Sequence, residues 1–146
     1  MEKLIVSVDV GGTFCDCLLH KAGQISSFKL LSSGKLRAIV TKTINPSSFE
    51  IKQQWALPYP EVIKGCFIKS MTSKRSASIK SFDPSTQIIK MNVSLPLKPG
   101  DQVEIYMDAE VVVFATHLIT GIPVDQRLDQ VELRVGTTKG TNALLE

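Results

Sequence analysis

The sequence of 146 residues has few cysteines and no long apolar run. Lys, Asp or Glu interrupts every hydrophobic stretch before the ~18 residues that a membrane span needs. The apolar run near the N-terminus is shorter than a signal-peptide core and ends at a carboxylate and two glycines. Three cysteines, an odd number, do not make a disulfide framework and fit a reducing interior. We therefore expect a cytoplasmic protein with no membrane partner.

Aromatic residues are also scarce, at 6% of the chain, and arginine is nowhere clustered. Residues 37–90 hold nine Lys or Arg against three acids, a balance of +6, whereas residues 91–146 hold four against eight. A basic segment can meet nucleic acid or another polyanion. Its charges are spread singly along the predicted strands, with few rings to stack on bases, so we favour a solvated β surface and expect no nucleic-acid partner.

The pattern of apolar residues predicts an α/β protein. Residues 4–10, 14–20 and 25–31 are typical of three strands joined by turns, which is an antiparallel meander. Residues 35–107 contain many short β segments between Pro and Gly breakers, typical of a small barrel or sandwich.

The C-terminal part predicts a helix followed by a strand. Asp108 can cap a helix that Gly121 and Pro123 end, and residues 131–135 form a strand that runs into Gly136. Residues 141–146 look like the start of another helix, with no stop signal after it. We expect a front piece of a longer protein, whose partner is the remainder of the same chain and whose uncovered apolar faces favour self-association.

The sharpest motif is Asp9-Val10-Gly11-Gly12-Thr13, between the first two predicted strands. Glycines let backbone N–H groups approach phosphate oxygens, the Thr13 hydroxyl adds a donor, and a carboxylate at a strand end can hold magnesium through water. No Lys follows the glycines and a strand comes next, which excludes a Walker loop and a dinucleotide fingerprint. An ordinary hairpin turn remains the alternative.

Two segments resemble one known family. Asp9-Val10-Gly11-Gly12-Thr13-Phe14-Cys15-Asp16 resembles the Asp-x-Gly-Gly-Thr-Phe-Thr-Asp opening of the hydantoinase A/oxoprolinase family, with Cys15 in place of Thr. The stretch from Gly136 to Glu146 resembles its Gly-Thr-Thr-x-x-Thr-Asn-Ala-Leu-Leu-Glu segment. The family belongs to the actin-like ATPase superfamily. The resemblance implies a ribonuclease-H-like lobe of residues 1–34 plus 108–146, with residues 35–107 as an inserted β-rich subdomain.

The implied activity is ATP-dependent opening of a cyclic amide or imide, such as a hydantoin or 5-oxoproline. Phosphorylation of the ring carbonyl oxygen supplies a leaving group, and water completes the hydrolysis. By motif position Asp9 would hold Mg²⁺ or orient the attacking group, Asp16 would assist, and the phosphates of ATP would lie against Gly11, Gly12 and Thr13. The nucleotide and substrate cleft would be lined by Gly136, Thr137, Thr138 and Asn142. The alternative role for these residues is to cap a helix without binding a ligand.

Two further hypotheses stay open. Asp-x-Gly-Gly-Thr is shared by sugar-kinase-like proteins and activator ATPases of the same superfamily. The basic β-rich insert is a candidate binding module for a polyanion or for a companion subunit of the hydantoinase B type. Alternation along the second strand also predicts that Cys15 and Cys17 point away from the face that carries Asp16. The piece alone should be inactive, since this superfamily closes ATP between two lobes.

Overall fold

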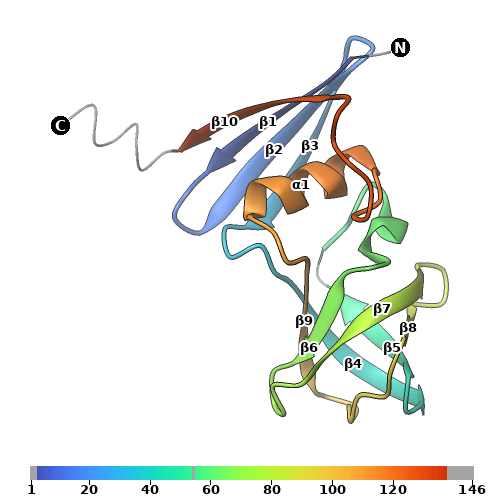
Figure 1. The fold of residues 1–146 in the computed structure, drawn as a ribbon. Coiled ribbons are helices and arrows are strands. Elements are labelled where there is room, and N and C mark those ends of the chain that lie inside the picture. The colour runs from blue at the N-terminus through green and yellow to red at the C-terminus, as the bar shows by residue number, and fades with distance from the viewer. Residues whose placement is uncertain (1–2, 54, 138–146) are drawn as a thin grey trace.

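The computed structural model describes residues 3–53 and 55–137, which form a four-stranded sheet, a helix and a closed barrel (Figure 1). The sheet contains β1 (Leu4–Val10), β2 (Phe14–Lys21), β3 (Gln24–Leu31) and β10 (Val131–Thr137). The barrel contains β4 (Leu36–Asn45), β5 (Ser48–Gln53), β6 (Phe67–Ser70), β7 (Ser76–Asp83), β8 (Ile88–Met91) and β9 (Gln102–Tyr106). The helices are the 3₁₀ turn η1 (Pro60–Ile63) and α1 (Val111–Thr120).

The sheet has the strand order β10-β1-β2-β3. Its first three strands pair antiparallel, which confirms the predicted meander, and β10 joins the other side of β1 in parallel. Side chains alternate between the two faces. Val6, Val8, Cys15 and Cys17 are buried on the face that α1 covers, whereas Asp16 is exposed on the opposite face, as the alternation predicts.

Helix α1 lies between the sheet and the barrel (Figure 1). Its buried residues include Phe114, Leu118 and Ile119, and it contacts β1, β2, β3 and η1. The N-cap is Glu110, without a side-chain capping bond, so the prediction that Asp108 caps the helix is wrong. Gly121 ends the helix as predicted, in the left-handed region at φ 80°, and its N–H donates to His117 O at 3.0 Å.

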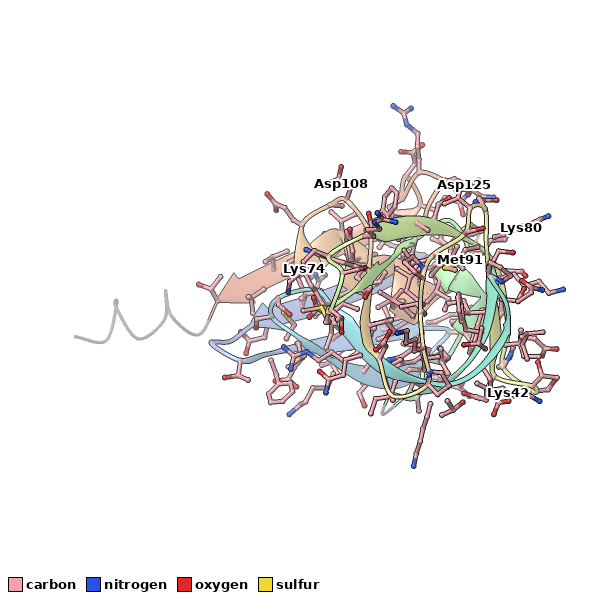
Figure 2. The ribbon with its side chains drawn as sticks, turned by 90° about the horizontal axis from the view of Figure 1, so that it is seen from below. Lys42, Lys74, Lys80, Met91, Asp108 and Asp125 are labelled. Atoms are coloured by element: carbon pink, nitrogen blue, oxygen red, sulfur yellow. The ribbon has the colours of Figure 1, made fainter. Side chains whose placement is uncertain are left out.

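The barrel closes in the strand order β4-β5-β8-β7-β6-β9. Of the two predicted alternatives, a barrel or a sandwich, the structure has the barrel. Phe49, Ile51, Ile68, Ile89 and Ile105 are at most 2% exposed and fill its interior. Figure 2 looks onto the barrel from below and shows the sticks of Lys42 and Lys80 on its outside.

The predicted fold class, an α/β ribonuclease-H-like lobe of the actin-like ATPase type, is wrong. The described chain is mostly β, with a closed six-stranded barrel and one α-helix. Apart from α1 and the short 3₁₀ turn η1, the regular elements among the described residues are strands, and β2 and the first half of β4 show the alternating burial typical of a strand. The helix predicted over residues 141–146 lies outside the described residues. Among residues 3–53 and 55–137, no helix is long and apolar enough to cross a membrane.

The end of α1 gives a first prediction. A Cβ added at Gly121 would lie 2.8 Å from the Tyr59 ring, whereas one at Gly100, also at positive φ, would meet nothing within 4 Å. Gly100→Ala should cost about 1 kcal/mol of backbone strain. Gly121→Ala should cost at least about 1 kcal/mol more, because the ring must move. Urea unfolding of both variants measures the difference, and equal losses would contradict a tight α1–η1 contact.

The buried thiols give a second prediction. Burial raises the pKa of Cys17 and of Cys66 to about 12, and it also raises the pKa of Cys15. Since the thiolate is the reactive form, native protein at about pH 8 should react with Ellman's reagent at least about a hundredfold more slowly than protein in concentrated guanidinium chloride. Fast reaction of one thiol in the native state would show that the segment carrying it opens locally.

Candidate functional site

The turn between β1 and β2 is built around Gly11. The Gly11 N–H donates to Phe14 O at 2.9 Å, and a Cβ at Gly11 would lie 2.8 Å from that same oxygen. Ser32, the residue after β3, makes two hydrogen bonds to this turn. Its hydroxyl donates to Gly11 O at 2.7 Å, and its N–H donates to Thr13 O at 2.8 Å. The turn is therefore fixed by close backbone contacts that a side chain at position 11 would break.

The tip of this turn offers hydrogen-bond donors to solvent. Gly12 and Thr13 are exposed, and a Cβ at Gly12 would meet nothing within 4 Å. Within the part of the chain that the structure describes, the amides of these two residues donate to no acceptor. These two N–H groups and the Thr13 hydroxyl are hydrogen-bond donors that an anion at the tip of the turn can use.

Asp9 and Asp16 lie next to each other on the open face of the sheet. They are Cα partners across β1 and β2, and both are exposed. Gly136 is the Cα partner of Asp9 on the other side, where a Cβ would lie 3.9 Å from Asp9 Oδ1. These residues line a depression of about 740 Å³, which we call the carboxylate depression. Because position 136 is a glycine, its strand presents no side chain to Asp9 at this register position.

Two cations share the carboxylate depression with the acids. Lys29 Nζ lies 3.5 Å from Asp16 Oδ1, and it lies 5.4 Å from the centre of the Phe14 ring. The two ion-pair side chains are each 61% exposed, so water screens their attraction and the pair contributes little to stability. Arg134 lines the same depression from β10 and pairs with Glu132 at 3.2 Å.

The donor set fits Mg²⁺. Two carboxylates on adjacent strands supply hard oxygen ligands, and this ion binds through one or two carboxylates while it keeps several waters. Among the described residues no group of three or more His, Cys, Asp or Glu could hold a metal ion. Further ligands would therefore come from water or from the oxygens of a bound phosphate.

The sequence-predicted site residues divide into three groups. The structure brings together Asp9, Asp16 and Gly136, with the Gly11–Thr13 turn following Asp9 along the chain. Thr137 lies elsewhere: it lines a depression beside α1 with Ala109 and Val135, on the other face of the sheet. Thr138 and Asn142 lie outside the described residues. Strand β10 continues through Thr137, so Gly136 belongs to a strand and not to a strand-to-helix turn.

Sequence reasoning missed Lys29, Ser32 and Arg134. A signal existed for Lys29, because hairpin register pairs it with Asp16 once the turn after β2 is placed. Ser32 follows the predicted meander by one residue, and its reach back to Gly11 depends on how β3 ends. Arg134 enters the site only through the parallel pairing of β1 with β10, which joins residues more than a hundred positions apart.

No protein-family model, no curated protein and no solved structure matches this chain. The likeness to the hydantoinase A/oxoprolinase family thus rests on short segments of the sequence, namely the two motifs and residues 28–37, which also resemble the family. One motif, around Asp9 and Asp16, is seen in the structure as the hairpin and carboxylate pair described above. The other motif begins at Gly136 and lies mostly outside the described residues.

The turn supports a third prediction. Gly11→Ala should destabilise the protein by about 1–3 kcal/mol, because its Cβ collides with the Phe14 carbonyl. Gly12→Ala is the matched control and should change the free energy of unfolding by less than about 0.5 kcal/mol, since its Cβ points into open space. Thermal unfolding compares the two variants. Equal destabilisation of the two variants would contradict the close contact between position 11 and the Phe14 carbonyl.

Proposed function

We propose that the carboxylate depression binds the Mg²⁺-bound phosphates of ATP, and that the chain is the nucleotide-binding part of an ATP-dependent hydrolase of cyclic amides. The observation that carries the proposal is the pairing of Asp9 with Asp16 on one exposed face, beside a turn with two amides that lack an acceptor among the described residues. The reaction itself comes from the resemblance of the two motifs, and the proposal does not depend on the actin-like lobe.

Each residue has a distinct role in this proposal. Asp9 and Asp16 hold the ion, which neutralises the phosphate oxygens when it is bound. The amides of Gly12 and Thr13 donate to a phosphate, and the charges of Lys29 and Arg134 oppose the negative charge that builds on the phosphoryl group. These groups hold the phosphates of ATP in place and neutralise their negative charge, which is the main task of a protein in phosphoryl transfer.

ATP is required because a ring amide is a poor electrophile. The carbonyl oxygen takes the γ-phosphoryl group while ADP leaves. A first water adds to the ring carbon, the ring C–N bond breaks to leave an acyl phosphate, and a second water releases phosphate from it. The net reaction converts ATP, two waters and the cyclic amide to ADP, phosphate and the open amino acid or ureido acid. A cytoplasmic setting is part of this proposal, because ATP is available there and all three cysteines are free.

The binding test uses isosteric variants. Asp9→Asn and Asp16→Asn should each weaken MgATP binding about tenfold to a hundredfold, because each removes a charged ligand and keeps the shape. Asp125→Asn is the matched control: this exposed carboxylate lines a different depression and should bind as the wild type does. Isothermal calorimetry with and without EDTA measures the affinity. Unchanged affinity in both site variants, or binding that EDTA leaves intact, would overturn the assignment.

The reaction class has its own readout. Supplied with ATP and 5-oxoproline or hydantoin, the intact enzyme should release free phosphate and an opened ring in equal amounts. A stable phosphorylated product would favour the kinase alternative, with the nucleotide site still in place. This outcome would show that the proposed reaction is wrong while the proposed nucleotide site is correct.

A further inference from the structure

A second depression lies where the edge strand β3 meets the barrel, and we call it the junction groove. It is lined from β2 and β3, from the start of β4 and from the segment after β5, and it has a volume of about 600 Å³. Small-molecule sites commonly measure about 300–1,000 Å³. The lining residues used below are Phe14, Lys29, Lys35, Arg37 and Trp55.

The wall of the junction groove is basic. Lys29, Lys35 and Arg37 line it, and among the described lining residues there is no Asp or Glu. Lys35 Nζ lies 3.8 Å from Glu104 Oε1, and Arg37 Nε lies 3.5 Å from Glu104 Oε2. One carboxylate, 8% exposed, therefore orients two cations. It can balance only one of them, so a positive charge is left for a ligand.

Aromatic rings stand beside these cations. Trp55 Nε1 donates to the Arg37 carbonyl oxygen at 2.9 Å, and the indole packs against Phe82 with 6.3 Å between ring centres. These two contacts fix the indole while it stays only partly buried. Phe14 adds a ring that is 46% exposed. Aromatic rings beside a cation can bind a flat anionic ligand, because the rings stack on the ligand and the cation neutralises its negative charge.

We infer that the junction groove binds a small ligand in which a planar ring carries a carboxylate or a phosphate. The ring lies against Trp55 and Phe14, and the anionic group faces Lys35 and Arg37. This inference does not rest on the proposed MgATP site, because Lys35, Arg37 and Trp55 are not among the residues that line the carboxylate depression.

The distribution of charge favours a small ligand over a nucleic acid strand. A strand needs a continuous basic track with successive rings along it. Lys42, Lys74 and Lys80 lie on different sides of the barrel (Figure 2), and none of them lines the groove. Among the described residues, the cations that line the groove are Lys29, Lys35 and Arg37.

Trp55 is the only tryptophan of the chain, so its fluorescence reports on the groove directly. In buffer with EDTA, nicotinate and AMP test the carboxylate and the phosphate as the anionic group, with nicotinamide and adenosine as their neutral counterparts. At least one anion should change Trp55 emission saturably and bind at least about tenfold more tightly than its neutral counterpart, because hydrogen bonds to a charged group are stronger than those to a neutral one. Inorganic phosphate alone should bind much more weakly than AMP, since it has no ring.

Charge variants locate the binding. Lys35→Gln and Arg37→Gln should each weaken the preferred anion about fivefold or more, and each leaves one cation on Glu104, which protects the fold. Lys42→Gln is the matched control, since it removes an equal charge from an exposed barrel residue outside the groove. Thermal unfolding of every variant verifies that it is folded.

Three results with the small ligands and the charge variants would overturn the inference. They are no saturable change with either anion, equal binding of the anions and their neutral counterparts, and a loss in Lys42→Gln as large as in Lys35→Gln. A single-stranded oligonucleotide that binds far more tightly than AMP, with a steep salt dependence, would overturn the small-ligand assignment in favour of nucleic acid. Asp9→Asn should leave the Trp55 response unchanged, which separates this site from the carboxylate depression.

Discussion

The register between β1 and β2 is the constraint on which the candidate site depends. Because side chains alternate along a strand, a slip of β2 by one residue against β1 would turn Asp16 toward α1 and expose Cys15 and Cys17, while Asp9 stayed on the open face. Burial of these cysteines with Val6 and Val8 therefore fixes the carboxylates on the open face. At the end of the pair, the contact of the Gly11 amide with Phe14 O sets where the chain turns. Core packing and turn geometry thus specify one arrangement together.

The second constraint is the path of the chain between β3 and β10. After the meander the chain builds the whole barrel, returns through α1 and only then adds β10 beside β1. This return brings Gly136 next to Asp9 and Arg134 onto the open face. It also leaves the barrel against the β3 edge, where Lys35 and Arg37 stand beside residues of β2 and β3. The carboxylate depression and the junction groove are both products of that one connection.

Local patterns in the sequence predicted the local structure well and the global arrangement poorly. The meander, the glycine end of α1 and the outward direction of Asp16 follow from alternation and turn chemistry, which act over a few residues. Parallel pairing of β1 with β10 and closure of the barrel are set by packing between distant segments, so no short pattern encodes them. The resemblance around Asp9 pointed to a whole α/β lobe, but an eight-residue motif constrains a hairpin and leaves the fold around it open. Trp55 and Glu104 acquired their roles only when the barrel placed them beside Arg37.

Lys29 links the two depressions, since it lines both of them. Its ammonium group lies 3.5 Å from Asp16 Oδ1. A cation bound by Asp9 and Asp16 would compete with Lys29 for the Asp16 carboxylate. Because the Lys29–Asp16 pair is exposed and screened, its loss costs the fold little, and the ammonium group can turn to the phosphates of a bound nucleotide as the proposed function requires.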